Sequence, residues 1–274
     1  MNKMILAAAS LVVAGMIAGC GSSGSMMSSD PAATTVAGKV ADGYLENATV
    51  FMDKNGNYIQ DAGEPFAVTD ANGAYALTVD PADVGLYPII ALAEAGVTYD
   101  RTDVSATTPI VHSYLLSLPK ESVFGNVSSN FISPMSTQVR EMMETGTYAT
   151  MQQAMEELRV NLGLPAGTNM MGDYVAGQNT TMHTAAQNMA TVMGEQAPML
   201  FRNYSGSTRM DVNRYRGMMG TMFSNMSSVR ATAPQATMTE LMATMTANVT
   251  PITVGMPFMN MSTFFRGGMM GGRR

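Results

Sequence analysis

Residues 49–79 read TVFMDKNGNYIQDAGEPFAVTDANGAYALTV, and this stretch decides the predicted fold of the first half of the chain. Short runs of β-branched and aromatic residues alternate in it with turn-forming Gly, Asn and Asp, which is the pattern of consecutive strands. The pattern continues on both sides, so strands are expected at 36–40, 49–52, 66–68, 75–79 and 89–93. Asp70-Ala71-Asn72-Gly73 predicts a hairpin, because Asn-Gly tolerates the positive φ angles of a tight turn. We therefore expect a small β-sandwich over residues 34–118.

An acidic loop of twelve residues, Asp53–Glu64, separates the second and third expected strands. Oxygen-bearing side chains occupy its positions 1, 3, 5, 9 and 12, which suits calcium, a hard cation that collects six to eight oxygen ligands. The predicted ligands are the side chains of Asp53, Asn55, Asn57, Asp61 and Glu64 and, at position 7, the backbone carbonyl of Ile59. The alternative interpretation is a solvated acidic turn that binds no metal.

The loop departs from the helix-loop-helix calcium pattern at two positions. Glycine stands at position 4, Gly56, whereas position 6, where glycine is usual, holds Tyr58. The flanking residues are predicted strands and not helices. We therefore expect a calcium loop inserted in a β domain.

Four segments around this loop, Val36–Gly43, Ala48–Asn57, Asp61–Pro65 and Thr69–Tyr75, carry a family resemblance. Together they resemble the carboxypeptidase-regulatory-like and adhesin B-repeat modules of bacterial surface proteins. The resemblance implies a prealbumin-like β-sandwich in which the same loop residues bind calcium. It also implies a spacer or ligand-presenting role without hydrolytic residues.

The first twenty residues have the layout of a secretory signal. Lys3 precedes the apolar run Met4–Met16, which is shorter than the roughly 20 residues that a transmembrane helix needs. The following Ile17-Ala18-Gly19-Cys20 resembles the bacterial lipobox. The resemblance implies that residues 1–19 are removed and that Cys20 carries a lipid thioether. The alternative is an ordinary signal peptide that happens to contain a cysteine.

Lipidation of Cys20 has several consequences for the rest of the chain. Because Cys20 is the only cysteine, no internal disulfide forms, and thiol chemistry is unavailable. Residues 20–33, rich in Gly and Ser, are expected to form a flexible tether. Gly21-Ser22 lacks the retaining aspartate, which implies the outer membrane in a bacterium with two membranes.

The second half of the chain is predicted to be helical. After a linker at 119–132, Ser133 is expected to cap a helix whose first residue is Pro134. Apolar residues then recur at helical spacing in four groups: Met151, Met155, Leu158 and Leu162; Met182, Ala186, Met189 and Met193; Met219, Met222, Met226 and Val229; Met238, Leu241, Met245 and Val249. The predicted fold class is therefore α+β with two domains, a β-sandwich at 34–118 and a helical bundle at 133–250, followed by a Gly/Met-rich tail at 251–274.

The chain contains 30 methionines, an unusual load that allows two interpretations. Thioethers are soft ligands that suit Cu(I), so a periplasmic copper-handling protein is the alternative function. Most of these methionines fall at core positions of the expected helices, where Met serves as a flexible apolar filler. The exceptions lie in the tail at Met256, Met259, Met261, Met269 and Met270.

Composition and motifs narrow the function class. A net charge of −6 argues against nucleic acid as a partner. His112 and His183 are the only histidines, and no Gly-x-Ser-x-Gly or His-Glu-x-x-His motif is present, so we expect no enzyme. An enzyme acting on the cell wall or a polysaccharide is the least favoured hypothesis. The preferred one is a non-catalytic, membrane-anchored surface or periplasmic lipoprotein, calcium-stabilised, that contacts an unknown envelope protein or polysaccharide.

Overall fold

The computed structural model describes residues 32–102, 107–204, 207–230 and 243. The predicted signal segment 1–19, Cys20, most of the tether and the tail 251–274 lie outside these residues, as does the helical face of Met238, Leu241, Met245 and Val249. All the described residues belong to one compact unit. Within the described ranges, no helix is long and apolar enough to cross a membrane.

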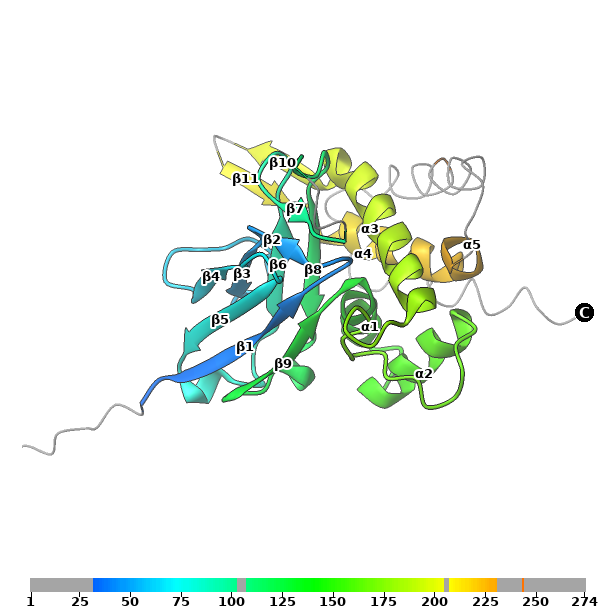
Figure 1. Cartoon of the computed structure of the whole chain (residues 1–274). Coiled ribbons are helices and arrows are strands. Elements are labelled where there is room, and N and C mark those ends of the chain that lie inside the picture. The colour runs from blue at the N-terminus through cyan, green and yellow to red at the C-terminus, as the bar shows by residue number, and fades with distance from the viewer. Residues whose placement is uncertain (1–31, 103–106, 205–206, 231–242, 244–274) are drawn as a thin grey trace, which may run out of the picture. The chain divides into compact units, whose positions relative to one another are not determined.

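The predicted mixture of sheets and helices is confirmed (Figure 1). The first half contains β1 (Thr34–Val40), β2 (Leu45–Glu46), β3 (Thr49–Met52), β4 (Phe66–Val68), β5 (Ala74–Val79), β6 (Ile89–Ala93), β7 (Tyr99–Asp100), β8 (Tyr114–Leu118) and β9 (Val127–Ile132). The five strands expected from the sequence are all present, within two residues at each end. The two-domain division, the prealbumin-like topology and the helical bundle stay predictions.

The strands form two main sheets, with orders β5-β1-β9 and β4-β3-β6-β8, and a small pair, β2-β7. In β1 the buried residues Thr34, Val36, Gly38 and Val40 alternate with residues that are exposed or half-buried, as expected for a strand with one face against the interior. The second sheet is antiparallel throughout, with Thr49 opposite Leu92 and Leu92 opposite Leu115. This register places Thr49, Leu92 and Leu115 in one row across three strands.

The predicted hairpin at Asp70–Gly73 is wrong, although the turn itself is present. Gly73 has φ 69°, and the Asp70 carboxylate accepts hydrogen bonds from the amides of Asn72 and Ala74. However, β4 pairs with β3 and β5 pairs with β1, so the turn carries the chain from one sheet to the other. A Cβ at Gly73 would lie 2.5 Å from the carbonyl oxygen of Val40, which is a second reason for glycine there.

The segment 119–132, expected to be a linker, contains a short 3₁₀ helix, η2 (Lys120–Ser122), and β9, which pairs in parallel with β1. The buried side chain of Asn130 fixes β9, because its amide donates to the carbonyls of Ala37 and Phe124 and accepts from the Phe124 amide. Strand β9 is therefore part of the sheet, and it leads directly into the first helix.

The helices are α1 (Pro134–Glu144), α2 (Met151–Asn161), α3 (Thr180–Leu200), α4 (Val212–Ser224) and α5 (Met226–Arg230), with a hairpin of β10 (Phe201–Tyr204) and β11 (Ser207–Met210) between α3 and α4; a second 3₁₀ helix, η1 (Pro81–Asp83), lies in the first half. The predicted cap of α1 is confirmed: the Ser133 hydroxyl accepts from the Ser136 amide, and the Ser136 hydroxyl accepts from the Ser133 amide. Helix α2 begins in a similar way, because the Thr150 hydroxyl accepts from the Gln153 amide.

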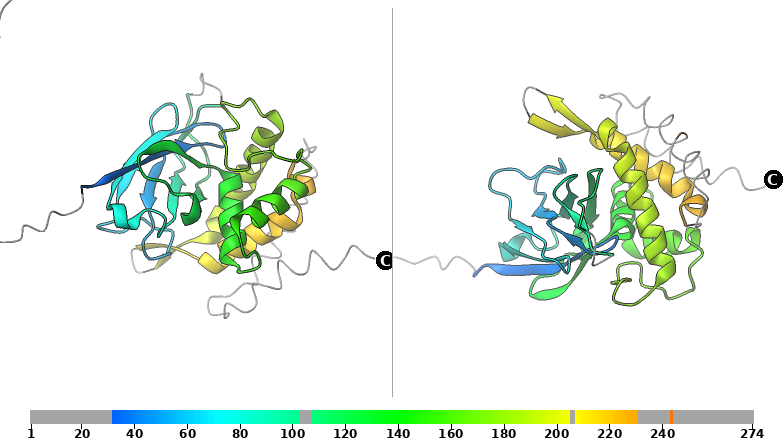
Figure 2. Two further views of the ribbon diagram at one scale, coloured as in Figure 1. Left: turned by 90° about the horizontal axis from the view of Figure 1, so that it is seen from below. Right: turned by 45° about the horizontal axis from the view of Figure 1, so that its top comes forward.

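Helix α1 lies at the centre, because residues 134–142 are all buried. It packs on β8 and β9 and contacts α2, α3 and α4. Figure 2 shows from two further sides that the helices gather on one side of the strands. The interior of the described unit is therefore continuous from the sheets into the helices.

Two of the predicted methionine faces are confirmed as core in full. Met182, Met189 and Met193 on α3 are buried, and so are Met219 and Met222 on α4. The face that begins with Met219 and Met222 continues onto α5 through the buried Met226 and Val229. Because α4 ends at Ser224, this face is divided between two helices and does not belong to a single one. On α2, Leu158 and Leu162 are buried, whereas Met151 and Met155 are half-buried against them.

Candidate functional site

The acidic loop leaves the sheet at the end of β3, and Asp53 organises its first turn. One carboxylate oxygen of Asp53 accepts from the amides of Gly56 (2.8 Å) and Asn57 (3.2 Å), and the other accepts from the amide of Tyr58 (3.1 Å). The Asp53 side chain is buried, so these amides replace the water that a carboxylate would otherwise require. The backbone of residues 56–58 therefore curls around the carboxylate of the aspartate at position 1.

Three of the other predicted ligands meet at one point. Oδ2 of Asp61 accepts from Nδ2 of Asn55 at 2.6 Å and from Nδ2 of Asn57 at 2.7 Å. Glu64 closes the loop, because its two carboxylate oxygens accept from the amides of Lys54 (2.7 Å) and Asp61 (3.0 Å). The side chains at positions 3, 5 and 9 thus converge, while those at positions 1 and 12 hold the backbone in place.

This donor set fits calcium by its chemistry, since every predicted ligand offers oxygen. In the part of the chain that the structure describes, no three His, Cys, Asp or Glu side chains come together as a metal-binding group. The carboxylates of the loop therefore need the amide oxygens of Asn55 and Asn57 and the carbonyl of Ile59 to complete a coordination shell. Rotating the two amides by half a turn would turn their oxygens towards Asp61, and it would break the hydrogen bonds that these oxygens accept from the backbone amides of Asn57 and Ile59.

Tyr58, the mismatch at position 6, has a structural explanation. Its φ is 63°, in the left-handed region that explains why glycine is usual at this position. The ring is buried at 2% exposure and packs on Tyr215 of α4 with a centroid distance of 5.3 Å. The hydroxyl donates a 2.6 Å hydrogen bond to Glu141 of α1. Burial of a large aromatic ring offsets the backbone cost of roughly 1–3 kcal/mol.

Tyr58 belongs to a buried network of charged groups beneath the loop. The Arg140 guanidinium lies 4.3 Å from the centre of the Tyr58 ring and 3.9 Å from Oδ2 of Asp53. Arg216 of α4 lies 3.4 Å from Glu141 and 3.3 Å from Glu144. Burial raises the pKa of Glu141, and the two arginines and the Tyr58 hydroxyl oppose that rise. The network joins the loop to two helices.

This network is not predicted from the sequence, although the sequence contains one signal of it. Arg140 and Glu141 are adjacent charges between the apolar residues Val139 and Met142, in a helix whose cap was recognised. Charged residues placed where a helix is otherwise buried require partners, and the partners come from other elements. Only the fold identifies them.

Another buried acid, Asp42, lies just after β1. Its Oδ2 accepts a 2.7 Å hydrogen bond from the Tyr114 hydroxyl, and Tyr174 donates to the neighbouring carbonyl of Ala41 at 2.8 Å. Burial raises the pKa of Asp42 from its ordinary value of 3.8 to about 7, and the nearby charge of Asp100 adds to this rise. The fold therefore favours the neutral form of this carboxyl.

The two histidines lie apart from the loop ligands. His112 Nε2 is 3.5 Å from a carboxylate oxygen of Glu195, and His183 Nε2 is 3.4 Å from the Thr102 hydroxyl. These contacts are those of half-exposed polar side chains. The described residues thus place oxygen donors, and not imidazoles, in the candidate site.

Comparisons with protein-family models, with curated proteins and with solved structures find no match to this chain.

We predict that Tyr58→Phe destabilises the fold by about 1–3 kcal/mol, because the buried Glu141 loses its hydroxyl donor. The measurement is urea unfolding of the purified chain at pH 7. The matched control is Tyr99→Phe, since the ring of Tyr99 is half-buried against Arg101 and not in the core. Equal stabilities of the two variants would contradict the role given to the Tyr58 hydroxyl.

We predict that Asp42 makes the fold less stable as pH rises from about 4 to 7. The folded pKa is raised, so in this window the native state keeps a proton that the unfolded chain releases, and the effect levels off above pH 7 at ~4 kcal/mol. Asp42→Asn, which cannot titrate, should remove this part of the decline. Urea unfolding from pH 4 to 8 measures it, and parallel curves for the wild type and the variant would contradict the assignment.

Proposed function

We propose that this chain is a non-catalytic lipoprotein of the bacterial envelope, anchored through Cys20, whose loop Asp53–Glu64 binds calcium and thereby stabilises a structural or binding module. The observation that supports it best is the convergence of Asn55, Asn57 and Asp61 in a loop whose ends are held by Asp53 and Glu64. The lipobox-like Ile17–Cys20 supports the anchor. The location that this implies is the outer membrane of a two-membrane cell, and the partner an envelope protein or a polysaccharide.

Calcium would act on the fold through charge. The loop brings three carboxylates, Asp53, Asp61 and Glu64, into twelve residues, and a divalent cation reduces their mutual repulsion. A ligand that binds only the folded state stabilises that state by mass action. Because Tyr58 connects the loop to α1 and α4, this stabilisation reaches the helices as well as the β-sheets.

A non-catalytic role is supported by what the buried carboxylates do. Asp53 accepts from backbone amides, Glu141 from the Tyr58 hydroxyl and Asp42 from the Tyr114 hydroxyl. Each of these groups is engaged by its neighbours in the fold and faces the interior. These contacts serve the fold, although Oδ1 of Asp42 is buried without a hydrogen-bond partner among the described residues.

The copper alternative receives no support from the described helices. Met182, Met189 and Met193 on α3 and Met219 and Met222 on α4 fill the core, which favours the packing interpretation of the methionine content. The tail methionines lie outside the described residues. Calcium stabilisation is therefore the preferred proposal.

We predict that calcium raises the thermal unfolding midpoint of the mature chain relative to a chelator, by an amount equivalent to about 2.7 kcal/mol at 100 times the dissociation constant. Asp61→Asn should reduce this response, because it removes a charged ligand while keeping an acceptor for Asn55 and Asn57. Circular dichroism provides the measurement. Glu121→Gln, an exposed acid on η2, is the control and should respond like the wild type.

Two outcomes would contradict calcium binding. One is an unfolding midpoint of the wild type that is the same with calcium and with chelator. The other is an undiminished calcium response in Asp61→Asn, which would move the effect away from this loop.

We predict that the chain expressed in a two-membrane bacterium incorporates labelled palmitate and loses residues 1–19, and that Cys20→Ala does neither. The reason is that the lipobox-like segment makes the Cys20 thiol both the attachment point of the lipid and the first residue after the cut. Mass spectrometry of the N-terminal peptide gives the second readout. Ser22→Ala is the control and should be processed normally, and an unlabelled wild-type chain would contradict the anchor.

A further inference from the structure

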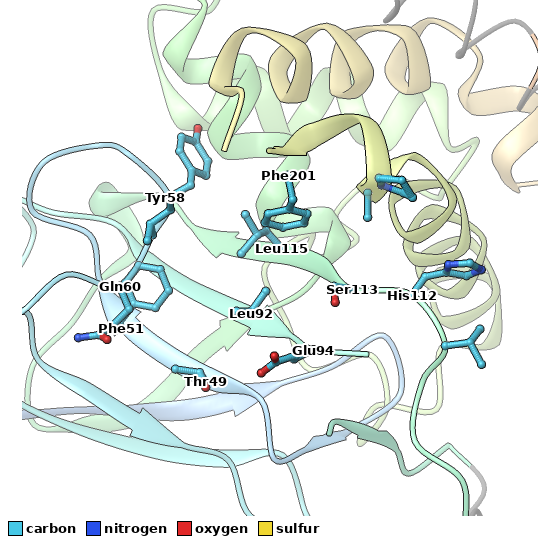
Figure 3. A pocket seen from close by; sticks show the side chains of 14 residues that line it. Thr49, Phe51, Tyr58, Gln60, Leu92, Glu94, His112, Ser113, Leu115 and Phe201 are labelled. Carbon is cyan, nitrogen blue, oxygen red and sulfur yellow. The ribbon is translucent and has the colours of Figure 1, made fainter. Parts of the chain in front are cut away.

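A cavity of about 560 Å³ opens beside the acidic loop (Figure 3). Its floor is one face of the sheet β4-β3-β6-β8, where Thr49, Leu92 and Leu115 form a row across three strands and Phe51 lies next to it. This volume falls in the range of pockets that take small organic molecules. The cavity is therefore large enough for a ligand.

The remaining walls come from segments far apart in the sequence. Ala197 and Pro198 near the end of α3 and Phe201 at the start of β10 form one wall, and Tyr58, Ile59 and Gln60 of the acidic loop form another. Val111, His112 and Ser113 lie on the approach to β8, and Glu94 lies just after β6. Figure 3 shows Phe51, Leu92, Leu115 and Phe201 grouped in the cavity, with Glu94 at its edge.

The lining combines aromatic rings with negative charge. Phe51, Tyr58 and Phe201 supply three rings, but the Arg140 guanidinium already lies 4.3 Å from the centre of the Tyr58 ring, so Phe51 and Phe201 are the rings that a ligand would use. No lysine or arginine is among the 14 lining residues. His112 is paired with Glu195 at 3.5 Å, so its positive form would be balanced. The exposed carboxylate of Glu94 thus gives the edge of the cavity a negative charge. Aromatic faces and a carboxylate together attract organic cations and repel anions.

We propose that this cavity binds an organic ammonium ion with an apolar aliphatic or aromatic body. The body lies against Leu92, Leu115 and Phe201, and the ammonium group lies towards Glu94. This inference goes beyond the proposed function, because the lipid anchor plays no part in the binding and calcium makes no contact with the bound cation. Since Ile59 and Gln60 belong to the acidic loop, binding is measured at one fixed calcium concentration.

The test is a titration of the mature full-length chain in a nonionic detergent, with detergent alone as blank, followed by saturation-transfer NMR. The cationic probe is benzyltrimethylammonium, and the anionic probe of similar size is phenylacetate. We expect at least about a tenfold preference for the cation, which corresponds to ~1.4 kcal/mol. Equal binding of the two probes, or no binding of either, would overturn the proposal.

Variants locate the cation in the cavity. Glu94→Gln should weaken benzyltrimethylammonium binding about fivefold, as expected for a partly exposed ion pair, and Glu94→Lys should abolish it. Because Glu94 is exposed, neither change is expected to unfold the chain. Leu92→Trp fills the cavity and should remove binding, with its unfolding midpoint measured in parallel. Glu121→Gln on η2 is the matched control, and binding that is unchanged in both Glu94 variants would overturn the site.

Discussion

The hydrogen bond from the Tyr58 hydroxyl to Glu141 is the contact on which the arrangement of the described unit depends. It joins residues 83 positions apart, one in a loop of the sheet region and one in the buried helix α1. A buried carboxylate needs a donor or a positive charge, because transfer of a charge from water is costly. Glu141 can therefore be buried only where Tyr58 and Arg216 meet it, and this requirement fixes the loop against the helices.

The charged network adds specificity more clearly than it adds stability. The attraction within a buried ion pair offsets the desolvation cost of its charges only when the geometry is good. The ion pairs of Arg140 and Arg216, at 3.9 Å and 3.4 Å, therefore add little to the free energy of unfolding. They do define where α1 lies, together with the bond from the Ser117 amide to the Thr137 hydroxyl, which fixes α1 against β8. An apolar interface alone would tolerate a shift by one helical turn. Buried charges that must meet particular partners do not.

Sequence alone predicts the features that depend on neighbours along the chain. The strands at 49–52 and 89–93 follow from local residue type, and the cap at Ser133 follows from hydroxyl chemistry at a helix start. The turn at Asp70–Gly73 was recognised, but its strands pair with distant partners, so the change of sheet was not predictable. The same limit hid β9, whose residues are held by the distant Ala37 through Asn130. The loop ligands were predictable as a list, and the network beneath them was not.

Tyr58 also shows why a departure from a family pattern is informative. Its backbone turns the acidic loop, its ring lines the cavity and packs on Tyr215, and its hydroxyl binds Glu141. Glycine would satisfy the backbone at φ 63° but would leave Glu141 without this donor and one wall of the cavity missing. The strain of a tyrosine in the left-handed region is acceptable because three separate interactions use the side chain. The residue that weakens the likeness to a calcium loop is the one that joins that loop to the rest of the protein.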